Sequence, residues 1–251
     1  MKITNLALRS LVLGSTPISE MEQRQELKRI PNSIKRTAAL SIHLSVNHHP
    51  RLTASTLGVD LTVLRKLHLI GAGGDSIVFM DGDSNVLKLH HRTVFHSEST
   101  KQTDAKTRQE KFETLASYLG TFVVTQTSFI ANHPFIPKLS VVQTRQPYIR
   151  SNQDVDIFSR YSEQVDTGAL ETLLEKNQSA ADQLAQFVDN SVELYEHQRM
   201  VPDTRGKGNL VVNEHGEIIL VDATPTTRDN ISGQMCTLRQ LEHLGSILQE
   251  I

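Results

Sequence analysis

The chain has 251 residues, of which 38% are hydrophobic, so it can bury one large core or two modest ones. Its 26 Lys and Arg residues nearly balance 28 Asp and Glu residues, and the net charge of −2 gives no general attraction to nucleic acid or to an anionic membrane. The single cysteine cannot form an intramolecular disulfide, and no apolar run approaches the roughly 20 residues of a membrane-spanning helix, so we expect a cytoplasmic protein that does not span a bilayer.

The first part of the chain is predicted to be a helical extension, residues 1–64. Within it, residues 20–48 have apolar residues at helical spacing, interrupted at Pro31. From Leu67 the apolar period changes to that of strands. Three antiparallel strands are predicted there, with Asp81-Gly82-Asp83 as the hairpin turn between the second and the third.

A helix and two further strands are predicted next. Residues 101–119 place Phe112, Leu115 and Leu119 on one helical face, and Gly120 is a candidate C-terminal cap. Residues 121–130 and 137–143 have the composition of strands, separated by an Asn-His-Pro turn.

The rest of the chain is predicted to be mainly helical. A short helical segment is expected at 156–162, a long amphipathic helix at 179–199 and a last helix at 236–251. Between the last two helices, residues 209–213 and 217–222 are predicted to be strands joined by the turn Glu214-His215-Gly216.

The segment between the first two strands is rich in glycine. Glycines give the backbone conformations that other residues avoid, and they let main-chain amides approach a phosphate. Residues 71–78 match the loop pattern G-x-G-x-x-G-x-V, except that Ser76 replaces the third glycine. A dinucleotide-binding loop would instead open a helix. The candidate nucleotide-binding residues are Gly71, Ala72, Gly73, Gly74, Asp75, Ser76 and Val78.

Lys88 is a candidate phosphate ligand on the third predicted strand. Alternation puts it on the face opposite Leu87 and Leu89, where it points either to water or into a cleft beneath the glycine loop. A lysine beside phosphate usually needs a carboxylate partner, and the predicted helix offers Glu110 and Glu113. Glu113 is our choice because it lies closer to the apolar face, although both residues could be solvated helix glutamates.

Three polar residues near the second predicted hairpin form the strongest pattern. Asp203 lies on a polar loop, Asn209 begins one short strand, and Asp222 ends the next. The hairpin can bring Asn209 and Asp222 together, and oxygen ligands of this kind suit Mg²⁺ shared with nucleotide phosphates. Taken singly, such residues are commonly turn or cap residues.

Together these motifs resemble the protein-kinase-like superfamily, closest to the atypical RIO kinases and the bacterial lipopolysaccharide-core kinases. The resemblance covers residues 65–225. It implies an α+β, bilobal fold, with a five-stranded antiparallel N-lobe sheet and one helix over 65–148, and a reduced, mainly helical C-lobe over 149–251. It also implies Mg²⁺ and ATP bound between the lobes, with residues 141–149 as the last strand and the hinge beside adenine.

The resemblance further implies a role for each site residue. The glycines would cover the phosphates, Lys88 would contact them and pair with Glu113, and Asn209 and Asp222 would hold Mg²⁺. Asp203 would be the catalytic residue that accepts the proton of a substrate hydroxyl, with the substrate a protein, a sugar or a small molecule. Arg205 and Lys207 could neutralise charge on the transferred phosphoryl group, or could be exposed loop charges.

The sequence also departs from the kinase pattern. Val201-Pro202 stand where His-Arg normally precede the catalytic aspartate, and Asp203 lies six residues before Asn209 instead of five. Asp222-Ala223-Thr224 replaces D-F-G, no A-P-E segment is visible, and 29 residues follow Asp222. An ordinary peptide is therefore no better supported as a substrate than a sugar, lipid or other small hydroxyl compound.

Two other hypotheses remain. A nucleotide-binding pseudokinase would regulate a partner without phosphoryl transfer, which the altered loop around Asp203 favours. A helix-turn-helix DNA-binding segment fits the apolar spacing of residues 52–67, although the same positions suit a helix packed on the small lobe. Zinc binding by the pairs His48-His49 and His90-His91 is disfavoured, because adjacent strand residues point to opposite faces.

Overall fold

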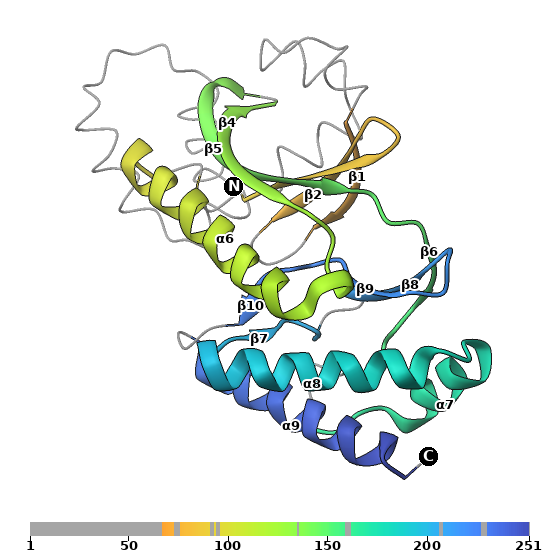
Figure 1. The fold of residues 1–251 in the computed structure, drawn as a ribbon. Coiled ribbons are helices and arrows are strands. Elements are labelled where there is room, and N and C mark those ends of the chain that lie inside the picture. Colours follow the sequence, from red (N-terminus) through yellow and green to blue (C-terminus); the bar gives the residue numbers. More distant parts are fainter. Residues whose placement is uncertain are drawn as a thin grey trace, which may run out of the picture. The chain divides into compact units, whose positions relative to one another are not determined.

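The structure is a computed structural model, shown in Figure 1. It describes residues 67–72, 76–90, 93, 96–134, 136–158, 162–205, 208–226 and 230–250. The predicted helical extension, the helix-turn-helix segment before Leu67, and residues 73–75, His91 and Lys207 lie outside the described residues. The chain forms two compact units, Met1–Thr107 with Thr127–Tyr148, and Arg108–Gln126 with Ile149–Ile251.

The first unit contains an antiparallel sheet of order β1-β2-β3-β5-β4. Its strands are β1 (Leu67–Ala72), β2 (Ile77–Asp81), β3 (Asn85–Leu89), β4 (Thr127–His133) and β5 (Ile136–Pro147). The predicted hairpin turn is confirmed with a shift of one residue, because Asp81 still pairs with Asn85 and the turn is 82–84. Gly82 has a φ of 71°, which glycine adopts without strain.

One face of this sheet is apolar. Ile77 pairs with Leu89 and Phe79 with Leu87, and these four buried side chains share a face because directly opposed strand residues do. The alternation that predicted these strands therefore also identifies their buried face.

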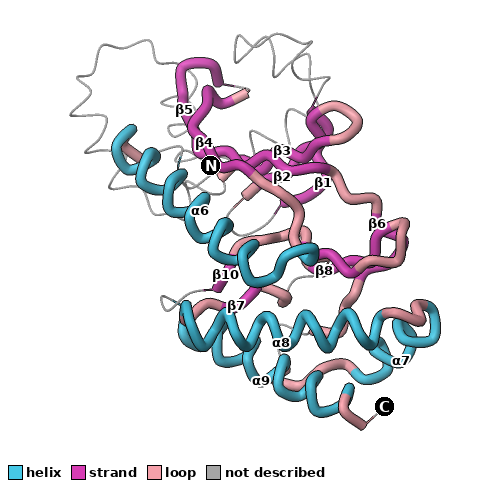
Figure 2. The backbone as a smooth tube through the Cα atoms, in the orientation of Figure 1, coloured by secondary structure: helices cyan, strands magenta, loops and turns pink. Residues whose placement is uncertain are grey.

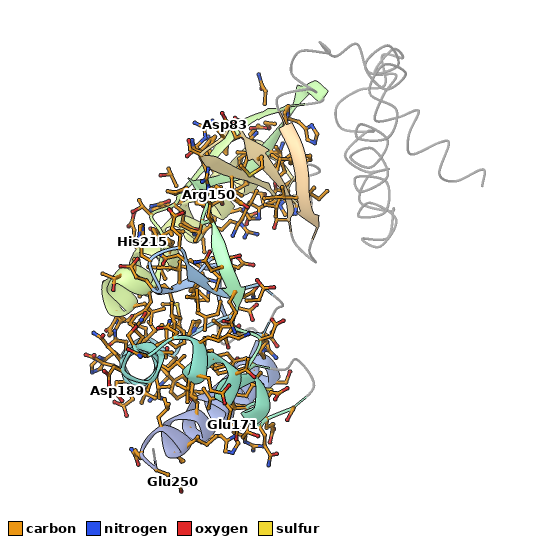
Figure 3. The ribbon with its side chains drawn as sticks, turned by 90° about the vertical axis from the view of Figure 1, so that its right-hand side faces the viewer. Asp83, Arg150, Glu171, Asp189, His215 and Glu250 are labelled. Atoms are coloured by element: carbon orange, nitrogen blue, oxygen red, sulfur yellow. The ribbon has the colours of Figure 1, made fainter. Side chains whose placement is uncertain are left out.

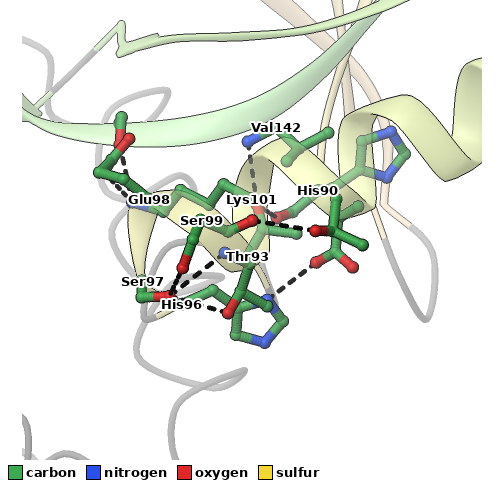
Figure 4. Close-up of polar contacts among 12 residues, drawn as sticks. His90, Thr93, His96, Ser97, Glu98, Ser99, Lys101 and Val142 are labelled. Carbon is green, nitrogen blue, oxygen red and sulfur yellow. Dashed lines mark hydrogen bonds and ion pairs between the residues drawn. The ribbon is translucent and has the colours of Figure 1, made fainter.

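Helix α6 (Glu98–Leu119) confirms the predicted helix but begins three residues earlier, at Glu98 instead of residue 101. Its start is capped by Ser97, whose hydroxyl accepts the N–H of Thr100 at 3.2 Å. In its first turn, Lys101 donates to Glu98 at 3.0 Å and to Ser140 of β5 at 2.7 Å (Figure 4). Ser140 and Lys101 both donate to the Glu98 carboxylate, which lowers its pKa.

The predicted strand 121–130 is confirmed only for residues 127–130, and residues 121–126 do not belong to a strand. Gly120 has a φ of 56°, as expected of a glycine that ends a helix, and Gly120–Phe122 form the short 3₁₀ helix η2. Strand β4 therefore begins at Thr127. Phe122 is buried in the core of the second unit with Phe112, Leu115 and Leu119, which explains why this apolar stretch is not a strand.

The second unit combines helices with short antiparallel strands. Figure 2 shows α8 and α9 as neighbouring helices, and their residues are in contact. The elements are β6 (Ser151–Asp154), α7 (Thr167–Lys176), α8 (Ala180–Gln198), β7 (Val201–Pro202), β8 (Leu210–Asn213), β9 (Ile218–Leu220), β10 (Pro225–Thr226) and α9 (Ile231–Leu248). The sheets have the orders β6-β8-β9 and β10-β7.

Most predictions for this unit hold, with two corrections. Helix α8 and the β8–β9 hairpin are confirmed. The short helix at 156–162 is wrong for its described residues, because Phe158 forms an antiparallel bridge with Val165. The last helix begins at Ile231 instead of residue 236, since the Asn230 side chain accepts the N–H of Gly233 at 3.2 Å and caps it.

Helices and antiparallel sheets thus make up the described chain, as predicted for an α+β protein. None of the helices in the described ranges combines the length and apolar character that crossing a membrane requires.

Candidate functional site

The candidate residues lie in two units, and each group is described within its own unit. In the first unit, Lys88 lies on β3, on the face opposite Leu87 and Leu89, as alternation predicts. Its side chain is buried, with 8% of the residue exposed. Burying an ammonium group is costly unless polar groups surround it, so the neighbours of Lys88 matter for its role.

Polar side chains of β5 and β4 lie next to Lys88 on its face of the sheet. Lys88 is directly opposite Thr144 of β5, which is opposite Ser128 of β4. The Thr144 hydroxyl is 2.8 Å from Nε2 of His90 and 2.9 Å from the Ser128 hydroxyl. His90, two residues after Lys88, is 4% exposed. The sequence analysis did not predict that His90, Thr144 and Ser128 lie near Lys88. The two-residue spacing of Lys88 and His90 places both on one face of a strand, but their neighbours on β5 depend on the strand register.

The glycine-rich segment is described only in part. Gly71 pairs with Val78 and Ala72 with Ile77, which joins the two ends of the segment by antiparallel pairing. Val78 is opposite Lys88 in the neighbouring strand, so these two residues share a face. Ser76 is half-buried.

In the second unit, a loop brings Asp203, Asn209 and Asp222 together. The side-chain amide of Asn209 donates to the carbonyl of Asp203 at 2.9 Å. The carbonyl of Asn209 accepts the N–H of Val221 at 2.7 Å, and Asp222 is the next residue. The predicted proximity of Asn209 and Asp222 therefore follows from main-chain pairing at the end of the β8–β9 hairpin.

A second pair of short strands joins the segments that flank Asp203 and Asp222. β7 pairs with β10, with Pro202 opposite Pro225 and Val201 opposite Thr226. Pro202 directly precedes Asp203, and Pro225 follows Asp222 by three residues. Sequence analysis missed both strands, because two residues are too few to show a period.

The two carboxylates have different partners. Oδ1 of Asp222 accepts the hydroxyl of Thr224 at 3.1 Å. Oδ1 of Asp203 accepts the N–H of Arg205 at 3.3 Å, and Nε of Arg205 is 4.0 Å from the same oxygen. Both aspartates are half-buried, so each is partly accessible to solvent.

The donor set fits a hard cation shared with a phosphate ligand. The amide nitrogen of Asn209 is engaged with Asp203, so the amide oxygen is the atom of this side chain that can bind a cation. With Asp222 it would supply two oxygen ligands, as is typical of Mg²⁺ sites that are completed by phosphates and water. In the described ranges no three His, Cys, Asp or Glu side chains gather into a metal site of their own.

Glu113 lies on the exposed side of α6, in the part of the helix that belongs to the second unit. Its carboxylate accepts a hydrogen bond from the side chain of Gln109 at 2.9 Å. Glu110 is exposed as well. The choice of Glu113 as the partner of Lys88 stays a prediction.

Comparisons with known proteins give little more. No protein-family model matches the chain, and the search of curated proteins finds no match. Among solved structures, the chain is similar to one described as the PpkA-294 apo form, with a TM-score of 0.37 and 12% identity. That match covers 71% of this chain and 62% of the other, so the chain spans less than two thirds of that neighbour's length. At this TM-score the likeness assigns neither a fold nor a function.

Proposed function

We propose that the chain is an ATP-dependent phosphotransferase with a bilobal, protein-kinase-like fold. The observation that carries the proposal is the hydrogen-bonded loop of the second unit, which gathers Asp203, Asn209 and Asp222. Lys88, which is buried and lies beside Thr144 and Ser128 in the first unit's sheet, supports it. Asp203 and Asp222 are partly accessible to solvent, as residues that contact a ligand must be.

In the proposed reaction, a substrate hydroxyl attacks the γ-phosphorus of ATP. The bond between the γ-phosphorus and the bridging oxygen breaks, ADP leaves, and the hydroxyl proton passes to Asp203. Asn209 and Asp222 would hold Mg²⁺, which neutralises charge on the phosphates. Lys88 would contact the phosphates beneath the segment 71–78, with Glu113 as its partner, and the acceptor would be a hydroxyl of a protein, sugar or small molecule.

A nucleotide-binding pseudokinase is the second candidate. The observation that favours it is the altered loop around Asp203, where Val201-Pro202 stand in place of His-Arg. The two candidates share nucleotide binding and differ in turnover, so one set of assays separates them.

The test is Mg²⁺-dependent ATP binding and ATP turnover by the full chain and two variants. Lys88→Met and Asp222→Asn keep the size of each side chain and remove its charge. We expect each to lower kcat/KM by about a hundredfold or more, because each group stabilises charge on the phosphates. Lys101→Met is the matched control for a buried lysine, and Asp189→Asn, labelled on α8 in Figure 3, is the control for an aspartate.

Each result has a defined meaning. Turnover that is lost in Lys88→Met and Asp222→Asn but kept in both controls supports the phosphotransferase. Tight Mg²⁺-dependent nucleotide binding by the wild type without turnover supports the pseudokinase. A wild type that does not bind ATP in the presence of Mg²⁺ contradicts both candidates.

A further inference from the structure

We infer that Gly233, in the first turn of α9, is a positioning residue for the proposed catalytic Asp203. Its missing side chain leaves the space that the Arg205 guanidinium occupies, and Arg205 in turn holds the Asp203 carboxylate. This inference rests on the proposed function and adds to it a residue of a distant helix.

A side chain at position 233 would force the neighbouring side chains to move. A Cβ atom built there would be 2.5 Å from Nη2 of Arg205 and 2.5 Å from Nδ2 of Asn230. Real Cβ contacts essentially never fall below 3.0 Å. Gly233 has no positive φ, so its backbone does not require glycine, and helix propensity alone would favour alanine. The contact with Arg205 and Asn230 is therefore the physical reason for a glycine at this position.

Arg205 reaches Asp203 in two ways. Its main-chain N–H donates to Oδ1 of Asp203 at 3.3 Å, and its Nε lies 4.0 Å from the same oxygen. Its side chain is only 17% exposed, so the guanidinium is packed in place. The main-chain hydrogen bond and the nearby guanidinium charge together favour one orientation of the carboxylate, and a general base needs a fixed orientation to face its proton donor.

Hydrogen bonds hold the main chain of Gly233 in the first turn of α9. The side-chain oxygen of Asn230 accepts the N–H of Gly233 at 3.2 Å, and the hydroxyl of Thr237 donates to the carbonyl of Gly233 at 3.1 Å. Thr237 is fully buried. Gly233 is thus held by the capping residue and by the next turn, so we expect an added side chain to displace the side-chain ends of Arg205 and Asn230 and not the helix backbone.

The experiment compares Gly233→Ala, Arg205→Ala and the double variant, with Mg-ATP as the probe and water as the acceptor. We expect Gly233→Ala to lower kcat roughly ten- to a hundredfold, as small misplacements of a catalytic group do, while KM for ATP stays within about twofold. The double variant should have a kcat close to that of Arg205→Ala alone, because the effect of the added methyl group on Asp203 passes through Arg205.

Gly245→Ala is the matched control. It lies in the same helix and gains the same helix propensity, but its Cβ would meet Cγ1 of Val188 at 3.4 Å, an ordinary contact. Its kcat should stay close to that of the wild type.

Three results would overturn the inference. Folded Gly233→Ala could have the kcat of the wild type, or the double variant could lose kcat by the product of the two single effects. Gly233→Ala could also raise KM for ATP and leave kcat unchanged. If Gly233→Ala does not fold, Arg205→Ala decides, since retained Mg-ATP binding with reduced kcat supports the inference and unchanged kcat contradicts it. A wild type without turnover contradicts the proposed function itself, whereas equal turnover in wild type and Gly233→Ala contradicts only the positioning role.

Discussion

At the scale of single residues, burial decides the protonation of His133. This residue ends β4 and is 4% exposed, and burial lowers its pKa from 6.5 to about 4. In the unfolded chain the same imidazole has its ordinary pKa near 6.5. The folded state therefore binds its proton less readily than the unfolded state.

This difference predicts a loss of stability in mild acid. Well above pH 6.5 His133 is neutral in both states, so its burial does not make the free energy of unfolding depend on pH. As the pH falls from 6.5 towards 4, only the unfolded state gains the proton, so the free energy of unfolding falls. Between pH 7 and pH 5 we expect the wild type to lose about 2 kcal/mol more than His133→Gln does, measured by urea unfolding.

The control for this prediction is His215→Gln, in the exposed turn labelled in Figure 3. It should keep the pH dependence of the wild type. Equal pH dependence of the wild type and His133→Gln would show that the buried imidazole does not resist protonation.

At the scale of elements, α7 shows a helix signal that the sequence analysis overlooked. Asp166 precedes the helix, and its side chain accepts the N–H of Ala169 at 3.0 Å, which is the geometry of an N-cap. Leu170 and Leu173 follow at helical spacing and are buried. The capping residue and the apolar spacing together could have predicted this helix.

The cap gives a stability prediction. Asp166→Ala leaves the main-chain N–H of Ala169 without its side-chain acceptor, so we expect the free energy of unfolding to fall by about 1 kcal/mol. Glu171→Ala, an exposed position within the same helix and labelled in Figure 3, should change it much less. Chemical denaturation of both variants is the measurement, and an equal effect would argue against the cap.

The strands show why local patterns predicted some elements and missed others. β2 and β3 have an apolar face and a glycine turn between them, so their period and their turn are both local. β6 is Ser-Asn-Gln-Asp and has no apolar pattern, and it exists as a strand because it pairs with β8. A strand that forms mainly through pairing with a neighbouring strand has no apolar alternation of its own from which it could be predicted.

At the scale of the whole molecule, the proposed site needs groups from both units, Lys88 from the first and Asp222 from the second. A ligand that binds only the folded protein raises its stability by mass action, by about 2.7 kcal/mol at a hundred times its Kd. Mg-ATP binding should therefore be visible as thermal stabilisation of the full chain.

We expect Mg-ATP to raise Tm of the wild type and of Lys101→Met, and to raise it much less in Asp222→Asn. Chelation of Mg²⁺ should remove most of the shift, because in the proposed site two protein oxygens would bind the ion together with the phosphates. Thermal unfolding with and without a chelator is the measurement. A shift that survives both chelation and Asp222→Asn would mean that ATP binds elsewhere.

The sequence by itself determined the long periodic helix α8, the strands and turn around Gly82, the face on which Lys88 lies, and the closeness of Asn209 and Asp222. Each follows from the spacing of residues within one element or one hairpin. Only the tertiary structure decided the burial of Lys88, the bonds of Thr144, the pairing of β7 with β10 and the contact of Arg205 with Gly233. These depend on residues far apart in the chain meeting through packing and strand register, which local periodicity does not encode.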